Sequence, residues 1–280
     1  MNIGAVVDGL IEKSKGSIKA EQGDYIDEAT GLLFCGKCGT KKQTRVEILG
    51  TVRTPMCLCK CEVEKREREE EERKRVEFEN HVKRMRRVGF PEEQMQTWTF
   101  ANDDLTNERL TRAMQRYVEN FAELRKVGKG LLLYGSVGTG KTYAACEVAN
   151  ALIDKGYPVH VTNFSRVLNT LQGTFDKQEY IDELNRYQLL VLDDLGIERE
   201  TAFAKEQVYN VIDARYRAGL PMIITTNLAI ANIKSPDNIG DSRIYDRILE
   251  RCFPIEVTGQ SRRRKAVVKE YDDMRDLLGL

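Results

Sequence analysis

The strongest constraint on the fold of this chain is the segment formed by residues 135–142, which fits the pattern G-x-x-x-x-G-K-[ST]. The apolar run 130–134 precedes it, and the amphipathic segment 141–154 follows it. Glycines allow a tight turn whose N–H groups face inward, and the start of a helix adds the positive end of its dipole. A strand, such a turn and a helix form a P-loop, so the sequence predicts a nucleotide-phosphate site.

Within this loop, Lys141 is expected to reach the β- and γ-phosphates, and the Thr142 hydroxyl is expected to bind Mg²⁺. The residues predicted to bind ATP here are Gly135, Ser136, Val137, Gly138, Thr139, Gly140, Lys141, Thr142 and Tyr143.

Three further apolar runs, at residues 158–161, 189–192 and 222–224, are typical of buried parallel strands. Longer amphipathic segments such as 205–218 separate them. Alternating strands and helices predict an α/β fold, a parallel sheet with helices on both faces. Ligands of such sheets bind at the carboxyl ends of the strands.

Polar residues stand at two of these strand ends. Asp193 and Asp194 follow the run 189–192, and Asn227 follows the third run closely. Asp193 is expected to contact Mg²⁺ directly or through water, Asp194 to polarise the attacking water, and Asn227 to orient that water and sense the γ-phosphate. The alternative is structural, because acids cap loops and asparagine favours turns.

A cysteine cluster occupies the N-terminal part of the chain, where five of the seven cysteines lie between residues 35 and 61. A C-x-x-C-G segment followed about twenty residues later by further cysteines predicts a structural Zn²⁺ site with four thiolate ligands. Residues 44–51 alternate enough to form a strand of a small ribbon, and redox sensing or free thiols are the alternatives. The favoured ligands are Cys35, Cys38, Cys59 and Cys61, with Cys57 as the alternative for one of the second pair.

The segment from residue 62 to 87 is almost wholly charged and is predicted to be a helical connector. It acts either as a plain spacer or as a lever or docking helix for a partner. The acid precedes the base by four residues, the order favoured on a helix, in Glu69–Arg73, Glu70–Lys74 and Glu71–Arg75.

The overall charge balance is neutral, although 31% of residues are charged, so any contact with DNA must use a local basic patch. We find no apolar run near the roughly 20 residues that a membrane span needs. Residues 1–16 lack the basic and apolar regions of a signal peptide. The expected location is the cytoplasm.

Four motifs together resemble one family: the P-loop, LLVLDDLG at 189–196, ITTN at 224–227 and SRIYDRI at 242–248, followed by a final strand and an arginine-rich segment. They resemble the helicase-loader branch of the AAA+ ATPases, in particular DnaC/DnaI-type loaders, including those encoded by phages and prophages. Transposition helper ATPases of the IstB type share this core. The resemblance covers the chain well from about residue 89 onward, and the cysteine module more loosely.

The composition and the strand–helix pattern divide the chain into three parts, a zinc-binding module at 1–62, a linker at 63–88 and, with the resemblance, an AAA+ ATPase domain at 89–280. The resemblance covers the last part best. It also implies roles for three arginines. Arg247 matches a finger that acts on the nucleotide of the next subunit, Arg243 is the second candidate for that role, and Arg263 matches an arginine that contacts the chain's own nucleotide. Since Asp194 stands where the family has a catalytic glutamate, hydrolysis is expected to be slow.

The function implied is that of an ATP-dependent loader that binds the replicative DNA helicase through the zinc module and delivers it to single-stranded DNA. Phe164 and Arg166 are candidate DNA contacts by stacking and by charge, although Phe164 is at least as well explained as a core residue. Self-association through the AAA+ interface is expected. The alternatives are an IstB-type transposition helper and a nucleotide-gated scaffold with little hydrolysis.

Overall fold

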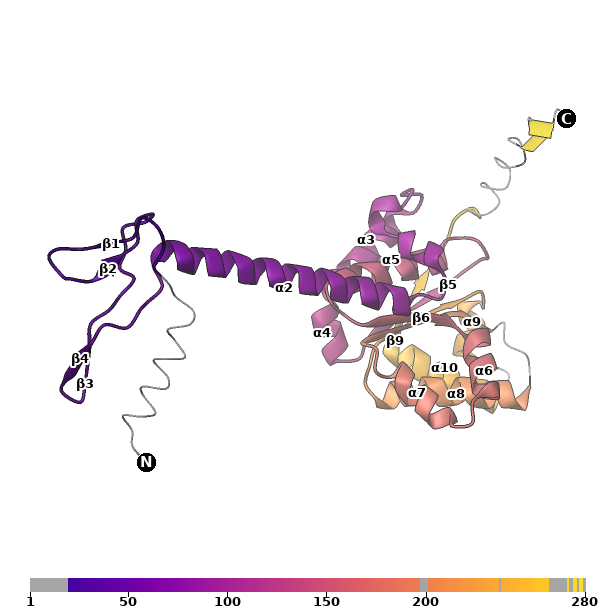
Figure 1. Ribbon diagram of the computed structural model, residues 1–280. Coiled ribbons are helices and arrows are strands. Elements are labelled where there is room, and N and C mark those ends of the chain that lie inside the picture. The colour runs from indigo at the N-terminus through magenta and orange to yellow at the C-terminus, as the bar shows by residue number, and fades with distance from the viewer. Residues whose placement is uncertain are drawn as a thin grey trace. The chain divides into compact units, whose positions relative to one another are not determined.

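A computed structural model describes residues 20–196, 201–236, 238–261, 271, 274–275 and 277–278 of the protein. The chain divides into two compact units, Met1–Glu79 and Asn80–Leu280. The division falls within one long helix, α2 (Lys60–Gly89), which continues from the first unit into the second (Figure 1).

The first unit contains two short antiparallel hairpins. β1 (Tyr25–Ile26) pairs with β2 (Leu33–Phe34), and β3 (Val46–Ile48) pairs with β4 (Thr51–Arg53). The segment predicted as one strand, residues 44–51, is therefore a hairpin arm and its turn. The chain reverses because Leu49 and Gly50 both adopt positive φ angles, 51° and 75°, which end the extended conformation.

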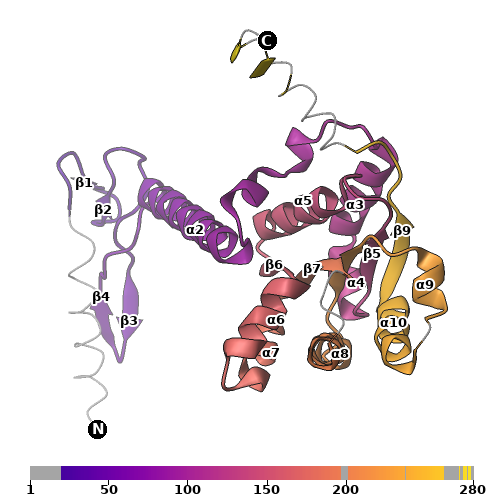
Figure 2. The ribbon, with the colours of Figure 1, turned by 90° about the vertical axis from the view of Figure 1, so that its right-hand side faces the viewer.

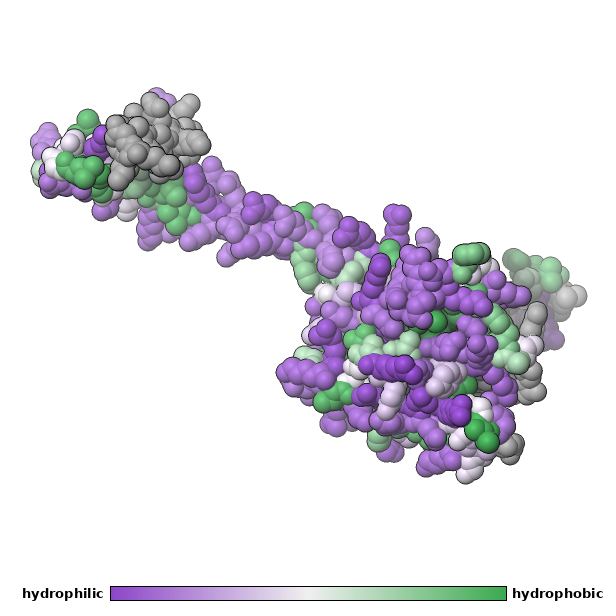
Figure 3. All heavy atoms as spheres, turned by 90° about the horizontal axis from the view of Figure 1, so that it is seen from below, coloured by the Kyte–Doolittle hydropathy of each residue, from purple (hydrophilic) through white to green (hydrophobic). Residues whose placement is uncertain are grey.

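Helix α2 confirms that the charged segment is helical, and its exposed length is hydrophilic (Figure 3). Of the three predicted ion pairs only Glu70–Lys74 forms, at 2.8 Å. Arg73 pairs instead with Glu77, and Arg75 pairs with Glu72 and Glu79. Each basic residue has acidic neighbours on the turns before and after it, so a different partner is equally within reach.

The second unit is built on a five-stranded parallel sheet, which confirms the predicted α/β fold (Figure 1). The strand order is β6-β7-β8-β5-β9, so β6 and β9 are the edge strands. The strands are β5 (Gly130–Tyr134), β6 (Val159–Asn163), β7 (Leu189–Leu195), β8 (Met222–Thr226) and β9 (Cys252–Glu256).

Helices cover both faces of the sheet, as predicted (Figure 2). Alternate strand residues point to opposite faces. Leu131 and Leu133 pack with α3, α4 and α5, whereas Leu132 packs with helices from α6 to α10. The helices of this unit are α3 (Glu108–Glu119), α4 (Phe121–Lys126), α5 (Lys141–Asp154), α6 (Phe164–Gly173), α7 (Lys177–Leu184), α8 (Ala202–Arg217), α9 (Ile230–Lys234) and α10 (Ile239–Arg251), with 3-10 turns at Glu93–Thr97 and Phe100–Asn102. In the described part of the chain, no helix has the length and apolar character needed to cross a bilayer.

Arg215 on α8 is the largest fully buried side chain of the second unit. Its guanidinium donates hydrogen bonds to the backbone carbonyls of Leu184, Tyr187 and Pro221. Leu184 ends α7, where the negative end of the helix dipole favours a cation. Burial lowers the pKa of Arg215 to about 9, which leaves it charged at neutral pH. The side chain therefore joins α8 to the end of α7 and to the start of β8.

We expect Arg215→Ala to destabilise the second unit by about 3 kcal/mol or more, because it leaves buried carbonyl oxygens without donors. Urea unfolding followed by the fluorescence of Trp98, the single tryptophan, measures this change. Arg217→Ala is the matched control, since that side chain is 74% exposed and a surface ion pair contributes about 1 kcal/mol or less. Equal stability of the two variants would contradict the role given to Arg215.

Candidate nucleotide site and cysteine cluster

The P-loop connects β5 to α5 with the bounds predicted for both elements. Side chains cap the N-termini of five other helices in this unit, α3, α6, α7, α8 and α10. No side chain of the described residues caps α5, whose preceding residue Gly140 has a φ of 98°. The N-terminus of this 14-residue helix therefore has no side-chain cap, and helix N-termini of this kind bind anions.

The loop glycines are required by close packing as well as by conformation. At Gly138, with a φ of 82°, a Cβ atom would lie 2.2 Å from the Ser261 hydroxyl oxygen. At Gly135, with a φ of 141°, it would lie 2.4 Å from the carbonyl oxygen of Val257. The chain after β9 therefore runs directly against the P-loop.

Lys141 is folded back into the loop and is 6% exposed. Its ammonium donates hydrogen bonds to the carbonyl oxygens of Gly135 and Ser136 at 2.9 and 2.7 Å, and to Asn227 Oδ1 at 2.8 Å. In P-loop proteins with bound nucleotide, the lysine ammonium contacts the β- and γ-phosphates. The structure thus brings Asn227 to the P-loop lysine, as expected of a γ-phosphate sensor.

The acid pair lies in an irregular part of β7. The strand continues to Leu195 rather than ending at Leu192, and two residues, Asp193 and Asp194, face Thr225 of β8. Such a bulge redirects side chains next to functional sites. Asp194 is the additional residue of the bulge. Its φ angle is 59°, a left-handed conformation that aspartate tolerates better than most residues.

The bulge places the Asp193 carboxylate between two hydroxyl groups. Thr142 donates to Asp193 Oδ1 at 2.8 Å and Thr225 donates to it at 2.5 Å, while Thr225 accepts the N–H of Asp194 at 3.0 Å. Burial raises the pKa of Asp193, and the hydrogen bond from Thr225 opposes that shift. A divalent cation would favour the ionised carboxylate, and the Thr142–Asp193 pair is the donor set that Mg²⁺ uses in P-loop proteins.

One residue of the site, Thr225, was not found from the sequence. Thr225 is fully buried, and its hydroxyl is hydrogen-bonded to the Asp193 carboxylate and to the Asp194 N–H group. The only signal in the sequence was its position in the polar end of a strand, shortly before Asn227. Tyr143 was predicted as part of the loop, yet its ring stacks on Trp98 at 5.5 Å and its hydroxyl donates to the Asn102 carbonyl. These contacts fix the segment before α3 beside the start of α5.

The two candidate arginines on α10 have different surroundings. Arg247 donates to Asp213 at 2.7 Å and to the Tyr209 hydroxyl at 2.9 Å, and it lies over the Tyr209 ring. To reach a neighbouring subunit, this side chain must leave those partners. The Arg243 guanidinium is exposed and has no hydrogen-bond or ion-pair partner among the described residues.

Two further candidates have separate outcomes. Arg263 lies outside the described residues. Phe164 is 1% exposed and packs in the core beneath α6, so the expectation that it stacks on a base is wrong. The first aromatic residue of an amphipathic helix faces the sheet here. Arg166, two residues later, is exposed.

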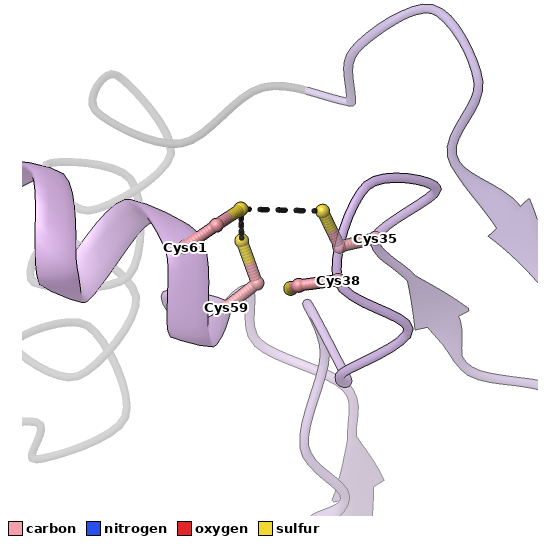
Figure 4. Close-up of side chains that lie close together, drawn as sticks. All are labelled: Cys35, Cys38, Cys59 and Cys61. Atoms are coloured by element: carbon pink, nitrogen blue, oxygen red, sulfur yellow. Dashed lines mark hydrogen bonds between the residues drawn. The ribbon is translucent and has the colours of Figure 1, made fainter.

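Four cysteines of the first unit converge, as predicted (Figure 4). Cys35 and Cys38 come from the turn after β2, and Cys59 and Cys61 come from the start of α2. Their sulfur atoms lie within 4.8 Å of one another. Four thiolates at about 2.3 Å from one zinc ion lie about 3.8 Å apart, so this set fits tetrahedral Zn²⁺.

Cys57, the fifth cysteine of the region, stands outside this group, with its sulfur 3.6 Å from the Lys41 carbonyl oxygen. All seven cysteines are free thiols. Backbone N–H groups of Cys38 and Lys37 lower the pKa of Cys35, whereas the neighbouring Cys59 and Cys35 raise that of Cys61. Four thiols this close together lose all their protons only when a cation bound between the sulfur atoms offsets the repulsion of the thiolates.

A buried ion pair supports the cysteine turn. Lys42 Nζ lies 2.7 Å from Asp24 Oδ2, and the two side chains are 6% and 4% exposed. Asp24 also accepts the N–H of Gly36, between the first two cysteines. The hydrogen bond from Lys42 is the main cause that lowers the pKa of Asp24 to about 2. Asp24 thus orients the turn that presents Cys35 and Cys38.

The parallel sheet, the P-loop, the acid pair of β7 and the asparagine after β8 define a P-loop ATP-binding protein. Residues 65–270 match the family described as IstB-like ATP binding protein. The chain belongs to this family.

Two of the individual relatives carry different names. The chain is 30% identical over 189 residues to an ATP-binding protein in an insertion sequence of Mycobacterium tuberculosis, covering 65% of this chain and 72% of that protein. It is 28% identical over 160 residues to the replicative helicase loader DnaI of Bacillus subtilis, covering 52% of this chain and 51% of DnaI. The chain therefore spans about half the length of this loader.

The crystal structure of DnaI has the same fold, with a TM-score of 0.55 and 24% identity, over 64% of this chain and 99% of that one.

Substitution of single cysteines tests the ligand set. Wild-type protein and Cys57→Ser are expected to bind about one zinc ion per chain, whereas Cys59→Ser is expected to lower zinc affinity by about 100-fold or more, because three thiolates leave the tetrahedron incomplete. Elemental analysis and competition with a chromophoric chelator measure both. Zinc loss in Cys57→Ser with retention in Cys59→Ser would show that the ligand set is wrong.

Proposed function

We propose that this protein is an ATP-dependent loader that binds a replicative DNA helicase and delivers it to single-stranded DNA during replication initiation. The observation that carries the proposal is the combination of a P-loop site in one unit with a separate four-cysteine cluster in the other. The similarity to the helicase loader DnaI supports it.

We assign separate tasks to three parts of the chain. Residues 1–62 bind a structural zinc ion and the helicase. Residues 63–88 form a helical linker between this module and residues 89–280, which bind and hydrolyse ATP. The connector lies wholly within α2, whose polar surface suits a spacer that remains in water. Because ATP binds to one unit and the helicase to the other, we propose that the nucleotide state of the ATPase part controls release of the helicase by residues 1–62.

ATP hydrolysis is proposed to be slow and switch-like. Lys141 and the uncapped start of α5 bind the phosphates, Thr142 and Asp193 bind Mg²⁺, and Asp194 polarises the attacking water. A carboxylate on a side chain one carbon shorter than glutamate lies farther from that water. Asn227, already bonded to Lys141, responds to the γ-phosphate.

Assembly and DNA binding complete the proposal. Arg247 acts on the nucleotide of the adjacent subunit, with Arg243 as the second candidate, and Arg263 contacts the chain's own nucleotide. Arg166, exposed on α6, meets the DNA backbone without the stacking partner first expected in Phe164.

A transposition helper ATPase is the second candidate, favoured by the 30% identity to the insertion-sequence relative over 72% of its length. Such a protein would coat duplex DNA and require a transposase partner. A nucleotide-gated scaffold with little hydrolysis is the third, and ATP turnover with and without single-stranded DNA distinguishes it from a loader.

The proposal predicts nucleotide-dependent capture of the host's replicative helicase. In a pull-down with purified proteins, wild-type chain is expected to retain the helicase to different extents with ATP and with ADP. Cys35→Ser/Cys38→Ser is expected to abolish capture, because the zinc module loses its metal. Cys57→Ser is the matched control and should capture as wild type does. Absence of capture in every nucleotide state would reject the loader and leave the transposition helper.

The finger is tested by mixing inactive variants. Arg247→Ala and Lys141→Ala are each expected to lower ATP turnover by about 10³-fold, the effect of losing charge at the transferred phosphoryl group. Mixed together they should regain activity, since one subunit supplies the arginine and the other an intact P-loop. Recovery with Arg243→Ala in place of Arg247→Ala would move the role to Arg243, and no recovery with either would exclude action in trans.

A further inference from the structure

A groove of about 1100 Å³ lies on the second unit, away from the nucleotide site. It begins where β5 starts, at Gly130, whereas the P-loop follows the other end of that strand. Its walls are α3 and the edge strand β9, and Phe253 at its rim is 69% exposed. The apolar residues that line it are Ala113, Leu124, Leu131, Leu249, Pro254 and Ile255.

The groove has a strong excess of positive charge. Five cationic side chains line it and only two carboxylates, those of Glu108 and Glu250. Three of the cations form one row along α3, at positions 109, 112 and 116, which lie on one face of a helix. Arg112 pairs with Glu108, but the guanidinium groups of Arg109 and Arg116 have no partner among the described residues. The groove thus fits an occupant with both apolar and acidic side chains.

The last residues of the chain have that chemistry. Tyr271, Met274, Leu277 and Leu278 are spaced three or four apart, as on one face of a helix, and are 71%, 53%, 82% and 62% exposed. Between positions 269 and 278 the sequence has four acids and two bases. Large apolar side chains at this spacing gain free energy when an apolar surface covers them.

The chain's own C-terminal segment can reach the groove. Ser261 lies against Gly138 of the P-loop, and β5 and β9 run parallel, so the far end of the groove is about one strand, roughly 17 Å, away. The ten residues from Ser261 to Tyr271 span up to about 35 Å. A tether of this length gives a local concentration on the order of millimolar, which favours the chain's own segment over that of another copy.

We propose that residues 270–278 dock into the groove between α3 and β9 of the same chain, with their apolar side chains against Phe253 and Ile255 and their acids against Arg109 and Arg116. This contact is independent of the proposed loader function. It covers the exposed face of the edge strand β9, which is otherwise open to association.

Hydrogen exchange of the full-length chain, measured by mass spectrometry, tests the docking. Amides of residues 270–278 are expected to exchange about tenfold more slowly in the wild-type chain than in a free peptide of that sequence. Arg109→Glu/Arg116→Glu should remove this protection. Arg84→Glu/Arg125→Glu introduces the same charge change at exposed positions outside the groove and should leave it intact.

A charge exchange completes the test. Adding Asp272→Arg/Asp276→Arg to the groove variant is expected to restore protection, because the opposite charges again face each other. Three results would overturn the proposal: exchange as fast as in the free peptide, protection that survives the groove substitutions, and protection that rises with protein concentration, which would assign the segment to a second copy.

Discussion

The arrangement of the nucleotide site depends on one carboxylate, that of Asp193. It accepts hydrogen bonds from Thr142 on α5 and from Thr225 on β8, so a single side chain joins three elements at one edge of the sheet. Backbone pairing alone aligns the strands, but it does not fix the helix that follows β5. The bulge at Asp194 is needed for this contact, because it turns two successive residues of β7 toward one residue of β8.

The hydrogen bonds of Lys141 couple the phosphate site to the end of β8. A buried ammonium requires acceptors, and here two loop carbonyls and Asn227 supply them. Thr225 and Thr226 precede Asn227 and donate hydrogen bonds to β7, so one short segment at the end of β8 contacts both the lysine and the strand that holds the acids. This connection supports the proposed role of Asn227 as a sensor of the γ-phosphate.

The sequence predicted β5 and α5 to the residue, because the loop glycines mark both ends. It did not predict that β7 continues past Asp193, since the bulge depends on pairing with β8, thirty residues away. For the same reason Thr225 was missed, as its role lies in contacts across strands. Phe164 shows a different limit, because whether an aromatic residue faces the sheet or solvent depends on the rotation of α6. The grouping of the four cysteines was predicted, because a shared metal ion would require their sulfur atoms to lie close together.

The two units differ in the apolar surface that they bury, and this difference supports the proposal of a structural metal in the first unit. Among its described residues, the buried side chains are Cys35, Cys59 and Lys42, so there is no apolar core of the kind that fills both faces of the sheet. An ion pair such as Lys42–Asp24 contributes little net stability after desolvation of both charges. A unit this small buries too little apolar surface to be stable by that means alone, so the zinc ion that we propose would supply free energy of folding. In that role the ion is structural, and apolar side chains such as Ile26, Leu49 and Val52 remain exposed on the surface of the unit.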